Sequence, residues 1–140
     1  MPHRAVGIVQ LIAGLAGLSL ALAPAPTVPA PARPGAWHQI GAAATARPGK
    51  PLHFYRTAQN PKALGFVVTS SSSRRFRVFW WSYCEFMSDD DMTQQYQGSA
   101  SGVRSVTVYP PVFDGATLCT VSVVATPPKA AKVTAAVFAY

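Results

Sequence analysis

Six short segments of the chain are rich in β-branched and aromatic residues, and those at 75–85 and 117–125 show the two-residue period of a β-strand with one buried face. These segments span residues 52–57, 63–69, 75–85, 103–109, 117–125 and 133–140. Pro, Gly, Asn, Asp and Ser cluster between the segments, and no stretch keeps a helical period. Short strands separated by turns predict an all-β domain, a small antiparallel β-sandwich of about six or seven strands.

The two cysteines lie on apolar rows that this alternation assigns to the core. The rows are Phe76, Val78, Trp80, Ser82 and Cys84 on one segment and Cys119, Val121, Val123 and Ala125 on another. Two cysteines on core-facing rows usually pair in an oxidising compartment, so we expect a disulfide between Cys84 and Cys119. Closing a loop of this length stabilises the fold by roughly 4 kcal/mol in the chain-entropy model.

The predicted architecture is immunoglobulin-like, but the chain lacks the signature of that family. An immunoglobulin domain has a core Trp well after its first Cys and a Tyr two residues before its second. Here Trp80 precedes Cys84, and Thr117 stands two residues before Cys119. The sequence therefore predicts a sandwich and not membership of the family.

The N-terminus has the pattern of a secretory signal. Arg4 is followed by an apolar run over residues 5–23 and then by small residues. Cleavage is expected at residue 23 or as late as residue 32, which leaves a mature form without a membrane span. The run is also long enough to remain as an uncleaved anchor. Both interpretations place residues 33–140 in an extracytoplasmic location, secreted or in the cell envelope.

Residues 24–51 are rich in Pro and Ala and predict a disordered linker ahead of a β-sandwich domain at 52–140. Seven of the 13 prolines fall in this segment, and proline both fixes φ and removes a backbone donor. Residues 37–40, Trp-His-Gln-Ile, interrupt the pattern. They are expected to form either a short strand or a tether that docks on the domain.

Charge narrows the choice of partners. The chain carries a net charge of +7 and only 12% charged residues, but four of the basic residues lie in the signal and linker. Residues 52–140 hold eight basic and five acidic residues, a net charge of +3. Export and the lack of a recognition motif exclude nucleic acid as the expected partner. The Ala-, Arg- and Pro-rich usage is typical of exported bacterial proteins.

The sequence predicts no enzyme, no cofactor and no metal site. It contains no G-x-S-x-G elbow, H-E-x-x-H motif or phosphate-binding loop. His53 could pair with an Asp and a Ser only by coincidence of folding, and a plain strand histidine is the simpler interpretation. Asp89, Asp90 and Asp91 lack the spacing of a calcium loop, so a solvated loop is favoured over a cation site.

The sharpest candidate for binding is a basic–aromatic strip on the face opposite the core row of residues 75–85. It consists of Arg75, Arg77, Phe79, Trp81 and Tyr83. Exposed, the strip would bind an anionic or glycan polymer, because rings stack on sugars and arginines bind anions. Alternatively the rings are covered by the linker, a neighbouring strand or a second copy of the chain.

Three functions are compatible with these features. We favour a non-enzymatic binding or structural module whose partner is a cell-envelope polymer, a glycan or another exported protein. The alternative is a small secreted effector, a toxin or protease inhibitor, with exposed loops at 87–98 or 110–115. A hydrolase built around His53 ranks last.

Overall fold

The computed structural model describes residues 27–33, 35–87 and 93–140. The predicted signal segment and Asp89, Asp90 and Asp91 lie outside the described residues. The strands are β1 (His38–Thr45), β2 (Leu52–Gln59), β3 (Leu64–Ser70), β4 (Arg75–Phe86), β5 (Thr93–Val103), β6 (Ser105–Val108), β7 (Ala116–Thr126) and β8 (Val133–Ala139). Within the part of the chain described, no helix is long and apolar enough to cross a membrane.

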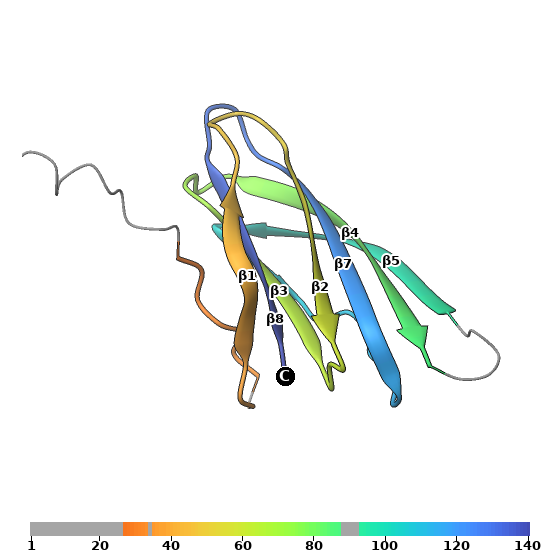
Figure 1. Ribbon diagram of the computed structural model, residues 1–140. Coiled ribbons are helices and arrows are strands. Elements are labelled where there is room, and N and C mark those ends of the chain that lie inside the picture. Colours follow the sequence, from red (N-terminus) through yellow and green to blue (C-terminus); the bar gives the residue numbers. More distant parts are fainter. Residues whose placement is uncertain (1–26, 34, 88–92) are drawn as a thin grey trace, which may run out of the picture.

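The strands form two antiparallel four-stranded sheets, which confirms the predicted sandwich (Figure 1). Sheet A has the order β1-β8-β3-β6, and sheet B has the order β2-β7-β4-β5. The pairs β1–β8, β2–β7, β3–β6 and β4–β5 are nested, as in one long hairpin rolled into two layers. This is the strand order of a jelly roll; the sequence predicted the two-layer architecture and no strand order.

The core lies between the sheets and is mainly aliphatic. Its fully buried side chains include Phe66 and Val68 from sheet A and Val78, Val121 and Val123 from sheet B. Each such side chain contributes about 1.5–3 kcal/mol through burial. The predicted core row of β4 faces inward as expected: its members are buried, except Trp80, which is half-buried.

Trp80 packs under a glycine of the neighbouring strand. It pairs across the ladder with Gly98 and packs against Phe66, with 6.3 Å between ring centroids. A Cβ atom on Gly98 would lie 2.8 Å from the indole, closer than any real carbon contact. Gly98 therefore provides the space in which the indole lies over β5.

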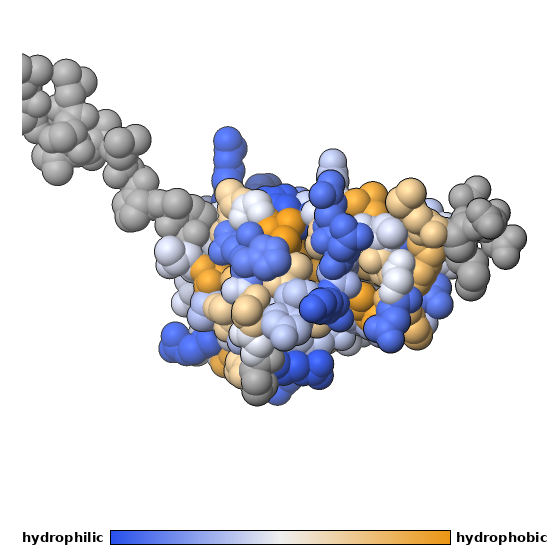
Figure 2. Space-filling view, turned by 60° about the horizontal axis from the view of Figure 1, so that its bottom comes forward, coloured by the Kyte–Doolittle hydropathy of each residue, from blue (hydrophilic) through white to orange (hydrophobic). Residues whose placement is uncertain are grey.

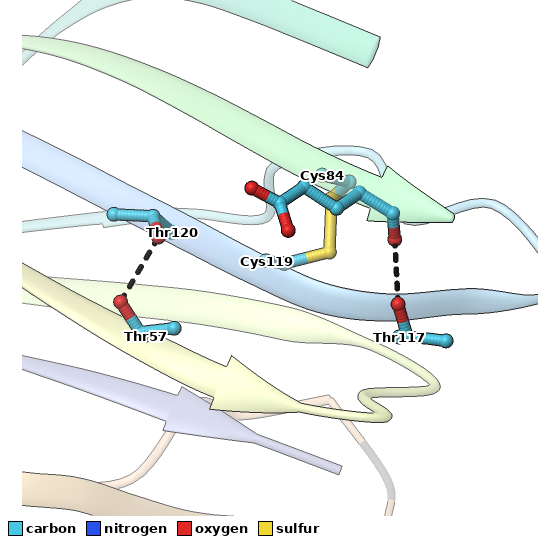
Figure 3. The surroundings of a disulfide bond; sticks show 6 residues. Thr57, Cys84, Thr117, Cys119 and Thr120 are labelled. Atoms are coloured by element: carbon cyan, nitrogen blue, oxygen red, sulfur yellow. Dashed lines mark hydrogen bonds between the residues drawn. A yellow bond between two sulfur atoms is a disulfide. The ribbon is translucent and has the colours of Figure 1, made fainter. Parts of the chain in front are cut away.

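The disulfide between Cys84 and Cys119 is confirmed, and it joins adjacent strands of one sheet (Figure 3). The two residues are direct partners in the β4–β7 ladder, with Cα atoms 4.1 Å apart. That spacing matches a pair that exchanges no backbone hydrogen bonds. Close by, the Thr117 hydroxyl donates to the Glu85 carbonyl at 3.1 Å. The register alone therefore brings the sulfur atoms together.

The segment predicted as a linker contributes to the fold. Residues 38–45 form β1, which pairs with β8 at the edge of sheet A. Ahead of it, Val28 is buried against the outer face of sheet A, where it packs with Val67, Ala136 and Phe138. Trp37 lies over the same face, 5.9 Å from the Tyr109 ring. Residues 37–40 thus contribute both to a strand and to a docked tether.

An arginine closes one side of the sandwich between β1 and β2. The Arg56 guanidinium donates to the Ala42 carbonyl of β1 at 2.6 Å and to the Tyr55 carbonyl at 2.7 Å. It approaches β1 at Gly41, whose φ of 68° belongs to a bulge in that strand. The side chain satisfies the Ala42 carbonyl, which lies in the bulge of β1, and the Tyr55 carbonyl of its own strand.

Candidate ligand-binding face

The outer face of sheet B presents three rows of side chains that cross all four strands. The rows are Thr57, Thr120, Tyr83 and Gln95; Tyr55, Ser122, Trp81 and Gln97; and His53, Val124, Phe79 and Ser99. We refer to these residues together as the aromatic face. Antiparallel register aligns them, because directly paired residues point to the same side of a sheet.

The rings of this face are open to solvent in the described structure. The exposed fraction is 67% for Tyr55, 48% for Trp81 and 44% for Phe79. Tyr83 is half-buried, whereas Arg75 and Arg77 are exposed. The basic–aromatic strip is therefore accessible along most of its length. Its binding role remains a prediction.

Tyr55 belongs to this face, although the sequence did not single it out. It pairs with Ser122, and Ser122 pairs with Trp81 on its other side. Strand spacing places the Cα atoms of the two aromatic residues about 10 Å apart. The alternation of residues 52–57 already put Tyr55 opposite the apolar Leu52 and Phe54. Only the strand order shows that it faces the same way as Trp81.

Shallow hollows lie beside the rings, between β4 and β5. The hollow beside Trp81 and Tyr83 has a volume of about 740 Å³ and reaches Gln95 and Gln97 of β5. A second hollow, lined by Phe79, Trp81 and Gln97 among others, adjoins it. The face thus offers ring surfaces with hydroxyl and amide groups beside them.

The three rows contain no Lys, Arg, Asp or Glu. Charged residues lie at the two ends of β4, with Glu85 beyond one end of the face and Arg75 and Arg77 beyond the other. Arg75 donates to the Ser101 hydroxyl at 3.3 Å, and the Arg77 guanidinium lies 5.8 Å from the centroid of the Phe79 ring. In the view of Figure 2, hydrophobic residues lie in separate patches between hydrophilic ones. The centre of the aromatic face is therefore suited to an uncharged ligand.

The two outer faces of the sandwich differ in what covers them. On sheet A, Val28 and Trp37 of the segment ahead of β1, the tether, pack on Val67, Ala136 and Phe138. On sheet B, no described segment covers the rings of Tyr55, Phe79 and Trp81 to a comparable degree. The tether therefore protects the apolar face of sheet A and leaves the aromatic face of sheet B to solvent.

His53 lies on the aromatic face, far from the described acidic residues. Its cross-strand partner is Val124, followed by Phe79. Glu85 lies opposite Leu118, which pairs with Gln59, so it sits about 20 Å from the His53 row along the strands. Among the residues described, no group of three His, Cys, Asp or Glu side chains could hold a metal ion.

Of the two segments proposed as inhibitor loops, the first is partly a strand, whereas the second is a short loop with Pro111, Phe113, Asp114 and Gly115 exposed. Residues 93–98 of the first belong to β5, because the structure extends this strand over Thr93–Val103. In the second, Pro110 is buried, and the Phe113 ring stacks on Tyr96 at 5.6 Å. The expectation of a long exposed loop at 87–98 is wrong for its second half.

Fold and site together define a disulfide-bonded β-sandwich with one covered and one open outer face. Comparisons with protein-family models, with curated proteins and with solved structures give no match to this chain.

Proposed function

We propose that this protein is a non-enzymatic binding module that acts outside the cytoplasm and binds a glycan of the cell envelope on its aromatic face. The observation that carries the proposal is the set of exposed rings, Tyr55, Phe79 and Trp81, on an uncharged sheet face. Sugar rings present apolar C–H surfaces, which pack on the negative faces of aromatic rings. Sugar hydroxyls bond to side chains such as Gln95 and Gln97, which both donate and accept.

The extracytoplasmic location rests on two features of the chain. The apolar run after Arg4 is typical of an export signal. The disulfide of Cys84 and Cys119 is compatible with an oxidising compartment. Intact mass of the protein recovered from each cell fraction tests the location. Loss of 23 to 32 N-terminal residues supports cleavage, and a full-length mass in the membrane fraction supports the anchor. Full-length protein with reduced cysteines in the cytosol would contradict both.

A neutral glycan fits the face better than an anionic polymer does. The central rows lack charge, and the nearest arginines lie at one end and contact Ser101 and Phe79. Binding dominated by arginine contacts to anionic groups weakens with salt, whereas ring stacking does not. We therefore expect retention on the ligand to persist from low to high ionic strength.

The direct test measures retention of the protein on purified cell-wall polysaccharide and in gels that contain soluble neutral glycans. Trp81→Ala and Tyr55→Ala each remove a ring and should weaken binding by about tenfold. Tyr140→Ala is the matched control, because its ring is 45% exposed and lies beside Trp37 at the covered side. Equal retention of all three variants, or background retention of the parent protein across the panel, would refute the proposal.

A further inference from the structure

Strand β5 forms an open edge of sheet B. Its eleven residues pair with β4 without a shift in register, from Arg75 opposite Val103 to Glu85 opposite Thr93. In Figure 1, β5 is the last strand of its layer, with β4 on one side only. An edge strand presents unpaired N–H and C=O groups, which can pair with another strand.

The other edge strands carry features that hinder such pairing. β1 has a bulge, and β6 has only four residues. β2 lies beside β1, and the Arg56 side chain of β2 donates a hydrogen bond to the Ala42 carbonyl of β1. By contrast, residues 93–103 contain no Lys, Arg, Asp, Glu or Pro. Charges, prolines, bulges and short length are the usual ways in which proteins block edge pairing. Of the described edges, β5 alone has none of them.

The register identifies the backbone groups that point outward from β5. Because Cys84 exchanges no backbone bonds with Cys119, its N–H and C=O groups point to β5 and bond to Gln94. The residues of β5 then alternate, and those with outward-pointing backbone groups are Thr93, Gln95, Gln97, Ser99, Ser101 and Val103. Among the described residues, no backbone hydrogen bond outside the β4 ladder reaches this strand.

We propose that β5 pairs antiparallel with β5 of a second copy, so that sheet B continues through a two-fold axis at Gly98. With this axis all eleven residues overlap, Gln97 lies opposite Ser99 of the other copy, and Gln95 lies opposite its Ser101. Both members of each pair point their backbone groups outward, so each pair exchanges two hydrogen bonds. No charge faces a like charge across the axis, and Gly98 allows the closest backbone approach.

A second copy fits this edge because two antiparallel β5 strands can pair along their whole length. A two-fold contact requires one surface that matches itself, and an uncharged, unbroken eleven-residue strand meets that condition. The resulting eight-stranded sheet would carry both aromatic faces on the same side. If the proposed glycan function holds, two linked faces bind a polymer more tightly than one. The pairing itself does not depend on that function.

Sedimentation velocity of the full mature chain, from low to high micromolar concentration, tests the pairing. We expect a dimer that dissociates on dilution. Ser99→Lys places two positive charges near the axis, and Gln97→Pro removes an outward N–H group without removing a bond to β4; both should give monomers. Thr57→Lys, an equally exposed position on β2, is the control and should remain dimeric.

Amide hydrogen exchange places the contact on the chain. Exchange at Gln97 and Ser99 should slow as the protein concentration rises, because their N–H groups are bonded only in the dimer. A parent protein that is monomeric at all concentrations overturns the proposal. So does a dimer that both β5 variants leave intact, since it must form through another surface. Neither result tests whether a single aromatic face binds a glycan.

Discussion

Breaking the disulfide should cost the fold a large part of its stability. Cys84 and Cys119 are 35 residues apart in sequence, so the bond closes a long loop in the unfolded chain. The chain-entropy relation gives about 13 cal/mol/K for this loop, or about 4 kcal/mol at 25 °C. Domains of this size have free energies of unfolding of about 5–15 kcal/mol. The reduced protein should therefore remain folded but marginally stable.

Urea denaturation of the oxidised and the reduced protein measures this difference. Reduction is carried out on the unfolded chain, because both cysteines are buried in the folded one. With a slope of about 2 kcal/mol per molar urea, the midpoint should fall by about 2 M. The double variant Cys84→Ala/Cys119→Ala is the control, since it lacks the bond and also the sulfur atoms. Its midpoint should lie near that of the reduced protein.

Two results would refute the reasoning. Equal midpoints and slopes for the oxidised protein, the reduced protein and the double variant would show that the loop is already constrained in the unfolded state. A reduced protein as stable as the oxidised one, beside a much weaker double variant, would show that packing of the sulfur atoms matters and loop closure does not. The first result would place the error in the assumed entropy of the unfolded chain, and the second would place it in the neglected packing of the core.

Three further substitutions test particular contacts by the same denaturation assay. Ser82→Ala should be neutral or raise the free energy of unfolding by up to about 1 kcal/mol, because the buried Ser82 hydroxyl has no hydrogen-bond partner among the described residues. A decrease in the free energy of unfolding of more than about 1 kcal/mol would show that the hydroxyl makes a hydrogen bond. Gly98→Ala should cost about 1–3 kcal/mol because it displaces Trp80, and unchanged stability would mean that the indole moves freely. Trp37→Ala should cost about 1–3 kcal/mol and speed proteolysis near Val28, which packs on Phe138 and its neighbours; resistance equal to that of the parent would contradict this docking.

The central strands could be predicted because their alternation is strong. Residues 75–85 were expected as a strand, and β4 spans Arg75–Phe86. The expected strand at 103–109 is shorter in the structure, where β6 spans Ser105–Val108. Arg104 between β5 and β6 has a φ of 66°, which breaks an extended backbone. An arginine with a positive φ cannot be recognised from the pattern of apolar residues.

Strand β5 was missed, and β1 was foreseen only at residues 37–40, because their buried faces have few large aliphatic residues. β5 faces inward with Gln94, Tyr96, Gly98, Ala100 and Gly102. Its place in the sheet depends on β4, where Trp80 fills the space over Gly98. β1 is rich in Gly and Ala and gains its position from pairing with β8 and from the Arg56 contact. Interactions from elsewhere in the chain thus override weak local propensity.

The sequence predicted the part of the aromatic face that lies on β4, but not the part on β2. Alternation on β4 separated Phe79 and Trp81 from the core row, and the structure confirms that separation. It could not show whether the rings are covered or that Tyr55 joins them, because both depend on β2, β7 and the tether. Ser122 connects the two halves of the face by pairing with Tyr55 on one side and Trp81 on the other.

Alternation and the cysteine count were enough to predict the strands with a clear buried face, the pairing of the only two cysteines and the side of β4 that carries the rings. These are local properties, since they follow from the two-residue period of a strand and from the number of cysteines. The jelly-roll order, the open face of sheet B and the exposed edge of β5 emerge only from the folded chain. They depend on register between segments far apart in the chain, such as Tyr55 with Ser122, and local alternation carries no information about which strands become neighbours.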